Sequence, residues 1–168
     1  LDMDGNQLST GKRRKTSEIL MHLTIFKHRP DVKACVHAHP PHATAFSVAK
    51  LDVPKCVMPE IEVLVGEVPI APYETPGTQK FADTLLPYLK DFSMILLANH
   101  GAVAMGKGIM DAYWKLEVVE AYCTTICIAR QLGDINQVTQ AQIGEIFQIK
   151  QKLGIPDRRI SDPVAARC

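Results

Sequence analysis

The chain has 168 residues, enough for one domain with a hydrophobic core. Its 46% hydrophobic and 22% charged content is ordinary for a globular protein, and its net charge of +1 favours neither nucleic acid nor an anionic membrane as a partner. No apolar run reaches the roughly 18 residues of a membrane span, and no secretory signal is visible, so we expect a cytoplasmic protein. Five cysteines without paired spacing favour free thiols in a reducing compartment.

Taken in order, the chain alternates helices with short apolar strands. Residues 1–15 are an expected irregular lead-in, with turn residues at Ser9-Thr10-Gly11 and a basic cluster, Lys12-Arg13-Arg14-Lys15, that we interpret as a solvated loop. The predicted helices are 16–29, with Thr16 as its N-cap, then 42–50, 78–86, 109–132 and 138–153. The predicted strands are 34–39, 93–98 and 102–105, with short bent strands within 53–68. The tail 155–168 is expected to be loose or to cross to a partner subunit. This interleaving predicts a layered α/β domain.

Three histidines stand where they could share a metal ion. His37 and His39 are two apart in a predicted strand, so their side chains leave the same face, about 6.6 Å apart at the backbone. That pair alone is a weak signal, equally consistent with packed histidines. His100 follows the predicted strand 93–98, and ligand sites in open α/β sheets collect just past strand ends. Three imidazoles leave a coordination position open, as a catalytic metal requires and a structural zinc lacks.

Acidic residues are the candidates for proton transfer beside such a metal. Glu18 is predicted at a helix start, where backbone amides and the hydroxyls of Thr16 and Ser17 could bind an anion. The alternative is that Glu18 is only a charge that stabilises the first helical turn. Glu60 and Glu62 lie among apolar residues, and because a buried acid needs a partner, we expect one of them to face the site.

Several motifs occur together in the order of a known family. They are Thr16-Ser17-Glu18, Val36-His37-Ala38-His39-Pro40-Pro41, Pro59-Glu60, Gly66-Glu67-Val68-Pro69, Pro76-Gly77-Thr78 and Leu96-Leu97-Ala98-Asn99-His100-Gly101. With these motifs the chain resembles the class II aldolase/adducin family. The resemblance implies a single domain over 1–168, a three-layer α/β/α sandwich around a mainly antiparallel sheet, and a C4 homotetramer with active sites at subunit borders.

The resemblance also implies an activity, that of the fuculose-phosphate aldolase-like members. His37, His39 and His100 would hold Zn²⁺, with Mn²⁺ or Co²⁺ as alternatives, and Glu18 would move the proton. Thr16 and Ser17 would remain from the phosphate pocket. The expected function is that of a zinc-dependent aldehyde-lyase that cleaves a ketose 1-phosphate, or a similar sugar phosphate, to dihydroxyacetone phosphate and an aldehyde through a metal-stabilised enediolate.

Other functions within the family stay open. Epimerase relatives carry aspartate where Glu18 stands, which favours an aldolase, whereas a dehydratase branch uses a glutamate aligned near Glu60 and keeps Glu60 as a second catalytic candidate. Adducin-like members have lost the metal histidines and serve as cytoskeletal scaffolds, and the presence of all three histidines here argues against that role. A non-catalytic scaffold module that keeps a metal for stability is a further alternative. An all-β cupin is disfavoured because the predicted helices 16–29 and 109–132 are long.

The chain departs from the family at its start. The family normally carries about fifty residues before this point, with Gly-Asn-x-Ser and Thr-Pro-Ser-Gly loops that bind substrate phosphate. Neither motif occurs here, so we expect either a domain without that segment or a substrate without phosphate. The fuculose-phosphate enzymes also have tyrosine in place of Met58, so that sugar is not assumed.

Overall fold

The computed structural model describes residues 1–168 except Thr10, Arg13 and Pro163. The expected turn at Thr10 and the Arg13 member of the basic cluster therefore lie outside the described residues.

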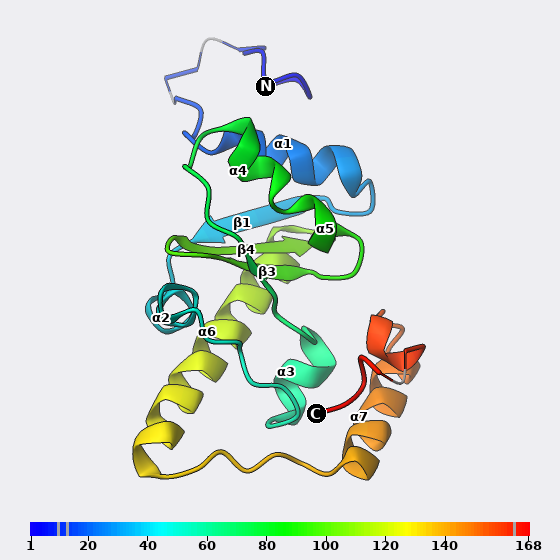
Figure 1. Ribbon diagram of the computed structural model, residues 1–168. Coiled ribbons are helices and arrows are strands. Elements are labelled where there is room, and N and C mark those ends of the chain that lie inside the picture. The colour runs from blue at the N-terminus through cyan, green and yellow to red at the C-terminus, as the bar shows by residue number, and fades with distance from the viewer. Residues whose placement is uncertain (10, 13, 163) are drawn as a thin grey trace.

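A four-stranded mixed sheet forms the centre of the fold (Figure 1). Its strands are β1 (Ala34–Ala38), β2 (Ile70–Ala71), β3 (Met94–Leu97) and β4 (Gly101–Gly106), in the order β1-β4-β3-β2. β4 runs antiparallel to both β1 and β3, and β2 runs parallel to β3. Every residue of β3 and β4 is buried, as the apolar sequence of these strands predicts for a sheet covered on both faces.

Helices cover both faces of the sheet. They are α1 (Ile19–His28), α2 (Pro41–Ala49), α3 (Pro59–Leu64), α4 (Gln79–Asp83), α5 (Leu86–Leu89), α6 (Ile109–Leu132), α7 (Gln140–Lys152) and the 3₁₀ helix η1 (Arg158–Ile160). One core cluster joins the sheet to α1, α4 and α5, and a second joins the opposite face to α2, α3 and α6. The predicted three-layer arrangement around a mainly antiparallel sheet is therefore confirmed.

Most predicted elements are present, but one boundary and one element type were wrong. The N-cap of the first helix is Glu18 and not Thr16, whose hydroxyl instead accepts a hydrogen bond from the Glu18 amide at 3.3 Å. The segment 53–68 forms no strand; it contains α3, which begins at Pro59 because proline suits the first helical position. The short strand β2 was not predicted.

The C-terminal segment, which was expected to be loose or to cross to a partner subunit, is anchored to its own chain. Cys56 and Cys168 form a disulfide across 112 residues of sequence, so the prediction of free thiols is wrong for these two cysteines. The cysteines therefore no longer indicate a reducing compartment. Cys35, Cys123 and Cys127 are free.

Buried charges hold the same segment to α3. Lys150 Nζ lies 2.7 Å from Asp157 Oδ2, and Arg159 contacts both Asp157 and Glu62, each at 2.7 Å. Either Glu60 or Glu62 was expected to face the histidines, and Glu62 does not, since its carboxylate is turned to Arg159. Burial opposes the charge of Asp157, but the hydrogen bonds from Arg159 and Lys150 outweigh it and lower the pKa of Asp157 to about 2.

Across the described residues, the helices are all too short or too polar to span a lipid bilayer.

Candidate metal centre

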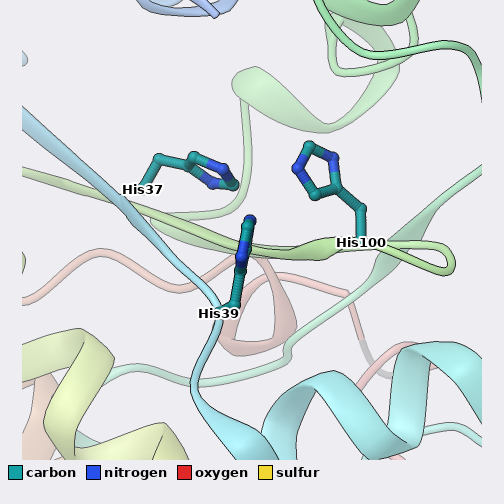
Figure 2. A group of neighbouring side chains, drawn as sticks. All are labelled: His37, His39 and His100. Carbon is teal, nitrogen blue, oxygen red and sulfur yellow. The ribbon is translucent and has the colours of Figure 1, made fainter. Parts of the chain in front are cut away.

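His37, His39 and His100 meet on one side of the sheet, as their spacing predicted. His37 belongs to β1, His39 follows that strand directly, and His100 lies in the turn between β3 and β4. One ring nitrogen from each histidine lies within 4.8 Å of the others, and the ring centroids are 4.9–5.0 Å apart. Figure 2 shows the three rings turned toward a common space. This cluster is consistent with a divalent metal site.

The tight turn between β3 and β4 brings the two halves of the cluster together. Asn99 takes the left-handed conformation (φ 55°), and the His100 amide donates to the Leu97 carbonyl at 3.0 Å. The next residue is Gly101, and a glycine is needed there because the end of β1 lies very close to its Cα atom. A Cβ atom at Gly101 would lie 2.6 Å from the Ala38 carbonyl oxygen and would collide with the His39 ring. The glycine thus allows the close approach of the two strands.

One hydrogen bond sets the tautomer of His37. Its Nδ1 lies 2.9 Å from the Ala102 carbonyl oxygen, which can only accept, so Nδ1 carries the proton. In the neutral ring, Nε2 then has a free lone pair, which is the form that binds a metal.

Glu18 completes the site from the helical layer above the sheet. Its Oε2 lies 3.1 Å from His37 Nε2 and its Oε1 lies 3.2 Å from His100 Nε2, while the residue is only 8% exposed. Burial lowers the pKa of His100, although the negative charge of Glu18 acts in the opposite direction. The lowered pKa favours the neutral imidazole, which is the form that binds a metal.

A divalent cation fits the groups that are present. Glu18 Oε2 and His100 Nδ1 are buried without a hydrogen-bond partner. Moreover, the neutral His37 tautomer turns a lone pair toward the Glu18 carboxylate, an arrangement that is unfavourable unless a positive charge lies nearby. Imidazole nitrogens suit zinc, and an adjacent carboxylate tolerates zinc, manganese or cobalt.

The other predicted site residues are less closely involved. Thr16 and Ser17 are exposed beside Glu18. Glu60 is exposed on α3, which packs on the opposite face of the sheet, so the structure does not bring it to the histidine cluster of its own chain. Its catalytic role stays a prediction.

Sequence reasoning missed two supporting residues. The Ala102 carbonyl and the Glu120 carboxylate each contact a residue far away in sequence, His37 and His42 respectively. Glu120 carried no signal in the sequence, because it is one of several acids on a long helix and its partner lies 78 residues away.

Known proteins with similar sequences are sugar-phosphate enzymes by name. An L-fuculose phosphate aldolase from Methanococcus maripaludis is 35% identical over 135 residues, which cover 79% of this chain and 70% of that protein. A 3-oxo-tetronate 4-phosphate decarboxylase from Escherichia coli is 36% identical over 149 residues, covering 85% and 68%. The chain spans 63% of the length of another Methanococcus maripaludis aldolase, at 37% identity.

Solved structures with a similar fold carry similar names. An L-fuculose 1-phosphate aldolase superposes with a TM-score of 0.81 at 28% identity, covering 92% of this chain and 71% of that one. A putative aldolase/epimerase/decarboxylase from Escherichia coli superposes with a TM-score of 0.76 at 32% identity, covering 88% and 70%. Residues 1–127 match the Class II Aldolase and Adducin N-terminal domain. The chain belongs to the class II aldolase and adducin family.

Proposed function

We propose that this protein is a zinc-dependent aldehyde-lyase that cleaves a ketose 1-phosphate, or a similar sugar phosphate, to dihydroxyacetone phosphate and an aldehyde. The observation that carries the proposal is the position of the Glu18 carboxylate, 3.1 and 3.2 Å from the Nε2 atoms of two candidate metal ligands, His37 and His100. The similarity to L-fuculose phosphate aldolases supports it.

His37, His39 and His100 would hold the metal, which when bound supplies a Lewis acid for the negative charge that develops beside the substrate carbonyl. Glu18 would exchange the proton at the carbon next to that carbonyl. In the cleavage direction, the C–C electron pair remains with the ketone fragment and the substrate hydroxyl releases its proton to solvent as the aldehyde forms. Protonated Glu18 then delivers its proton to the carbon of the ketone fragment at which the bond broke, and a proton from solvent restores it. Burial of Glu18 keeps bulk water away from this transfer.

The phosphate would bind near Glu18. Thr16 and Ser17 are exposed and carry hydroxyl donors immediately before this residue. They adjoin the N-terminus of α1, whose free amides favour an anion.

A second candidate reaction is the decarboxylation of a 3-oxo acid phosphate. It is favoured by the 36% identity to the 3-oxo-tetronate 4-phosphate decarboxylase over 149 residues. The two reactions make the same demand on the site, because both break a C–C bond and leave the electron pair beside a carbonyl. They differ only in the fragment that departs, an aldehyde or carbon dioxide.

We also propose a homotetramer with the metal centre near a subunit border. The start of α6 exposes a group of large apolar side chains, Ile109, Met110, Tyr113 and Trp114, that is typical of a subunit contact. His39 is itself exposed, so the centre opens at the surface of one chain. Light scattering after gel filtration should report four copies, and Trp114→Glu should lower the mass.

The decisive experiment compares metal content and turnover. The zinc-loaded protein is assayed with a panel of ketose 1-phosphates and with 3-oxo acid phosphates, scoring aldehyde and carbon dioxide separately. His37→Ala should lose metal and turnover together, whereas Glu18→Gln should keep the metal and lose turnover. Glu145→Gln, on the exposed side of α7, is the matched control and should change neither.

Each outcome has a consequence. Full turnover by Glu18→Gln would remove Glu18 from its role. A wild-type protein that binds zinc and releases neither aldehyde nor carbon dioxide from any substrate would favour the metal-stabilised scaffold module.

A further inference from the structure

The helix that follows the metal ligand His39 lacks a cap of its own. α2 begins at Pro41, with Pro40 as its N-cap residue and no side-chain hydrogen bond from that position. The amides of His42 and Ala43, in the first turn of the helix, have no partner within the helix and must find acceptors elsewhere.

Glu120, from the middle of α6, supplies those acceptors. Its Oε1 accepts from the His42 amide at 3.1 Å and its Oε2 accepts from the Ala43 amide at 2.9 Å. The His42 ring adds a third contact, Nδ1 to Oε1 at 2.8 Å. Burial opposes the charge of Glu120, yet the bonds from Ala43 and His42 outweigh it and lower the pKa of this carboxyl. A single carboxylate thus caps the helix from a distant part of the chain.

His39 is the ligand that most needs such support. The His37 ring is held by the Ala102 carbonyl, and the His100 ring packs on Phe81 with centroids 5.4 Å apart. Among the described residues, by contrast, nothing hydrogen-bonds to the His39 ring. Its position therefore depends on its backbone.

That backbone is fixed at both ends. On one side the β1–β4 ladder ends at the pair Ala38 and Ala102. On the other side stand Pro40 and Pro41, whose rings fix φ and which join His39 stiffly to α2. A displacement of the first turn of α2 would therefore be passed through the two prolines and would move the His39 backbone by a similar amount.

We propose that Glu120 is a positioning residue for the metal centre, which holds the first turn of α2 and thereby places the His39 ring for the metal. This inference rests on the metal-binding part of the proposed function and not on the reaction.

The test measures metal binding alone. Zinc affinity is determined by competition with a chromophoric chelator, and the visible spectrum of the Co²⁺-loaded protein reports the ligand geometry. Glu120→Ala should weaken zinc binding about 10–100-fold, the range found when groups that orient metal ligands are removed, and should change the Co²⁺ spectrum. Glu120→Gln keeps the shape but turns an NH₂ group toward an amide N–H, so it should weaken binding in the same direction. Glu145→Gln, at an exposed position of α7, should match the wild type.

A background variant separates positioning from general destabilisation. When His39 is already replaced by alanine, Glu120→Gln should cause no further loss of zinc affinity, because the ligand through which Glu120 acts is gone. A further loss of the same size in that background would overturn the proposal. So would a folded Glu120→Gln protein whose zinc affinity and Co²⁺ spectrum equal those of the wild type.

The readout keeps this inference apart from the lyase proposal. Wild-type protein that binds zinc without turnover would refute the lyase and leave the role of Glu120 intact. Unchanged metal binding in the Glu120 variants would refute the positioning role and leave the lyase intact.

Discussion

Gly101→Ala tests how closely the metal centre depends on the approach of two strands. The backbone at Gly101 is not in the left-handed region, so alanine is conformationally acceptable and the effect is steric. Its Cβ would lie 2.6 Å from the Ala38 carbonyl oxygen, and contacts under 3.0 Å force a shift. The end of β1 must therefore move by at least about 0.4 Å, whereas metal–ligand distances tolerate about ±0.2 Å. Because His39 follows Ala38 and its ring also meets the new methyl group, His39 is the ligand displaced.

The expected result is a loss of metal binding out of proportion to the loss of stability. Overpacking of this kind costs about 1–3 kcal/mol in the free energy of unfolding, which urea denaturation would measure. Zinc affinity, measured by chelator competition on the folded protein, should fall at least tenfold, as it does when the groups that orient a ligand are disturbed. Gly144→Ala in α7 is the control, because a Cβ there meets nothing within 4 Å. That change should stabilise the protein by about 0.5–1 kcal/mol and leave zinc binding unchanged.

The reasoning would be refuted if Gly101→Ala bound zinc within twofold of the wild type. In that case the strands would separate without moving His39, or His39 would not be a ligand. Measuring His39→Ala in parallel distinguishes these two explanations.

Three further predictions concern stability. Zinc at 100 times its dissociation constant should stabilise the protein by about 2.7 kcal/mol, seen as a rise in melting temperature that chelators reverse and that His37→Ala abolishes. The pKa of Asp157 falls from its ordinary 3.8 to about 2 in the folded state, so its stabilisation of about 2 kcal/mol is present above pH 4 and is lost as the pH falls toward 2. Urea midpoints between pH 5 and 2 should show this loss in the wild type and less of it in Asp157→Asn. Reduction of the Cys56–Cys168 disulfide, which spans 112 residues, should lower the free energy of unfolding by up to about 4–5 kcal/mol if the bond acts through loop entropy. The Cys168→Ser protein already lacks this contribution, so reductant should not change its stability.

The sequence predicted the elements whose signals are local. The strand at 34–39, the N-cap at Thr78 and the length of α6 depend on neighbours in the chain, and the structure contains β1 at 34–38, the Thr78 cap and a helix over 109–132. The convergence of His37, His39 and His100 was also predicted, from strand periodicity for the first two and from a strand end for the third, although it is the pairing of β1 with β4 that brings them together. A shared metal also restricts where its ligands can lie, because each metal–nitrogen bond is only about 2.0–2.1 Å long.

Features that depend on distant contacts were not predictable in the same way. The segment 53–68 was interpreted as strands because it is apolar and broken by prolines, but Pro59 starts a helix that packs on α6 and α7. The Cys56–Cys168 pair has no spacing signal across 112 residues. One of Glu60 and Glu62 was expected at the site because a buried acid needs a partner. Glu62 is buried and does have a partner, but that partner is Arg159, in the C-terminal segment.

The geometry of the centre argues for catalysis over a purely structural metal. A structural zinc is normally enclosed by four protein ligands, whereas here three histidines converge and one of them, His39, is exposed. A buried carboxylate oxygen without a hydrogen-bond partner costs about 1–3 kcal/mol or more, and Glu18 carries one beside the ligand nitrogens. A scaffold gains nothing from that cost, because the Glu18 side chain makes no capping hydrogen bond to the first turn of α1. A group that must take up and release a proton next to a metal requires such a position. We therefore expect the loss of Glu18 to leave metal binding and folding largely intact while removing the reaction.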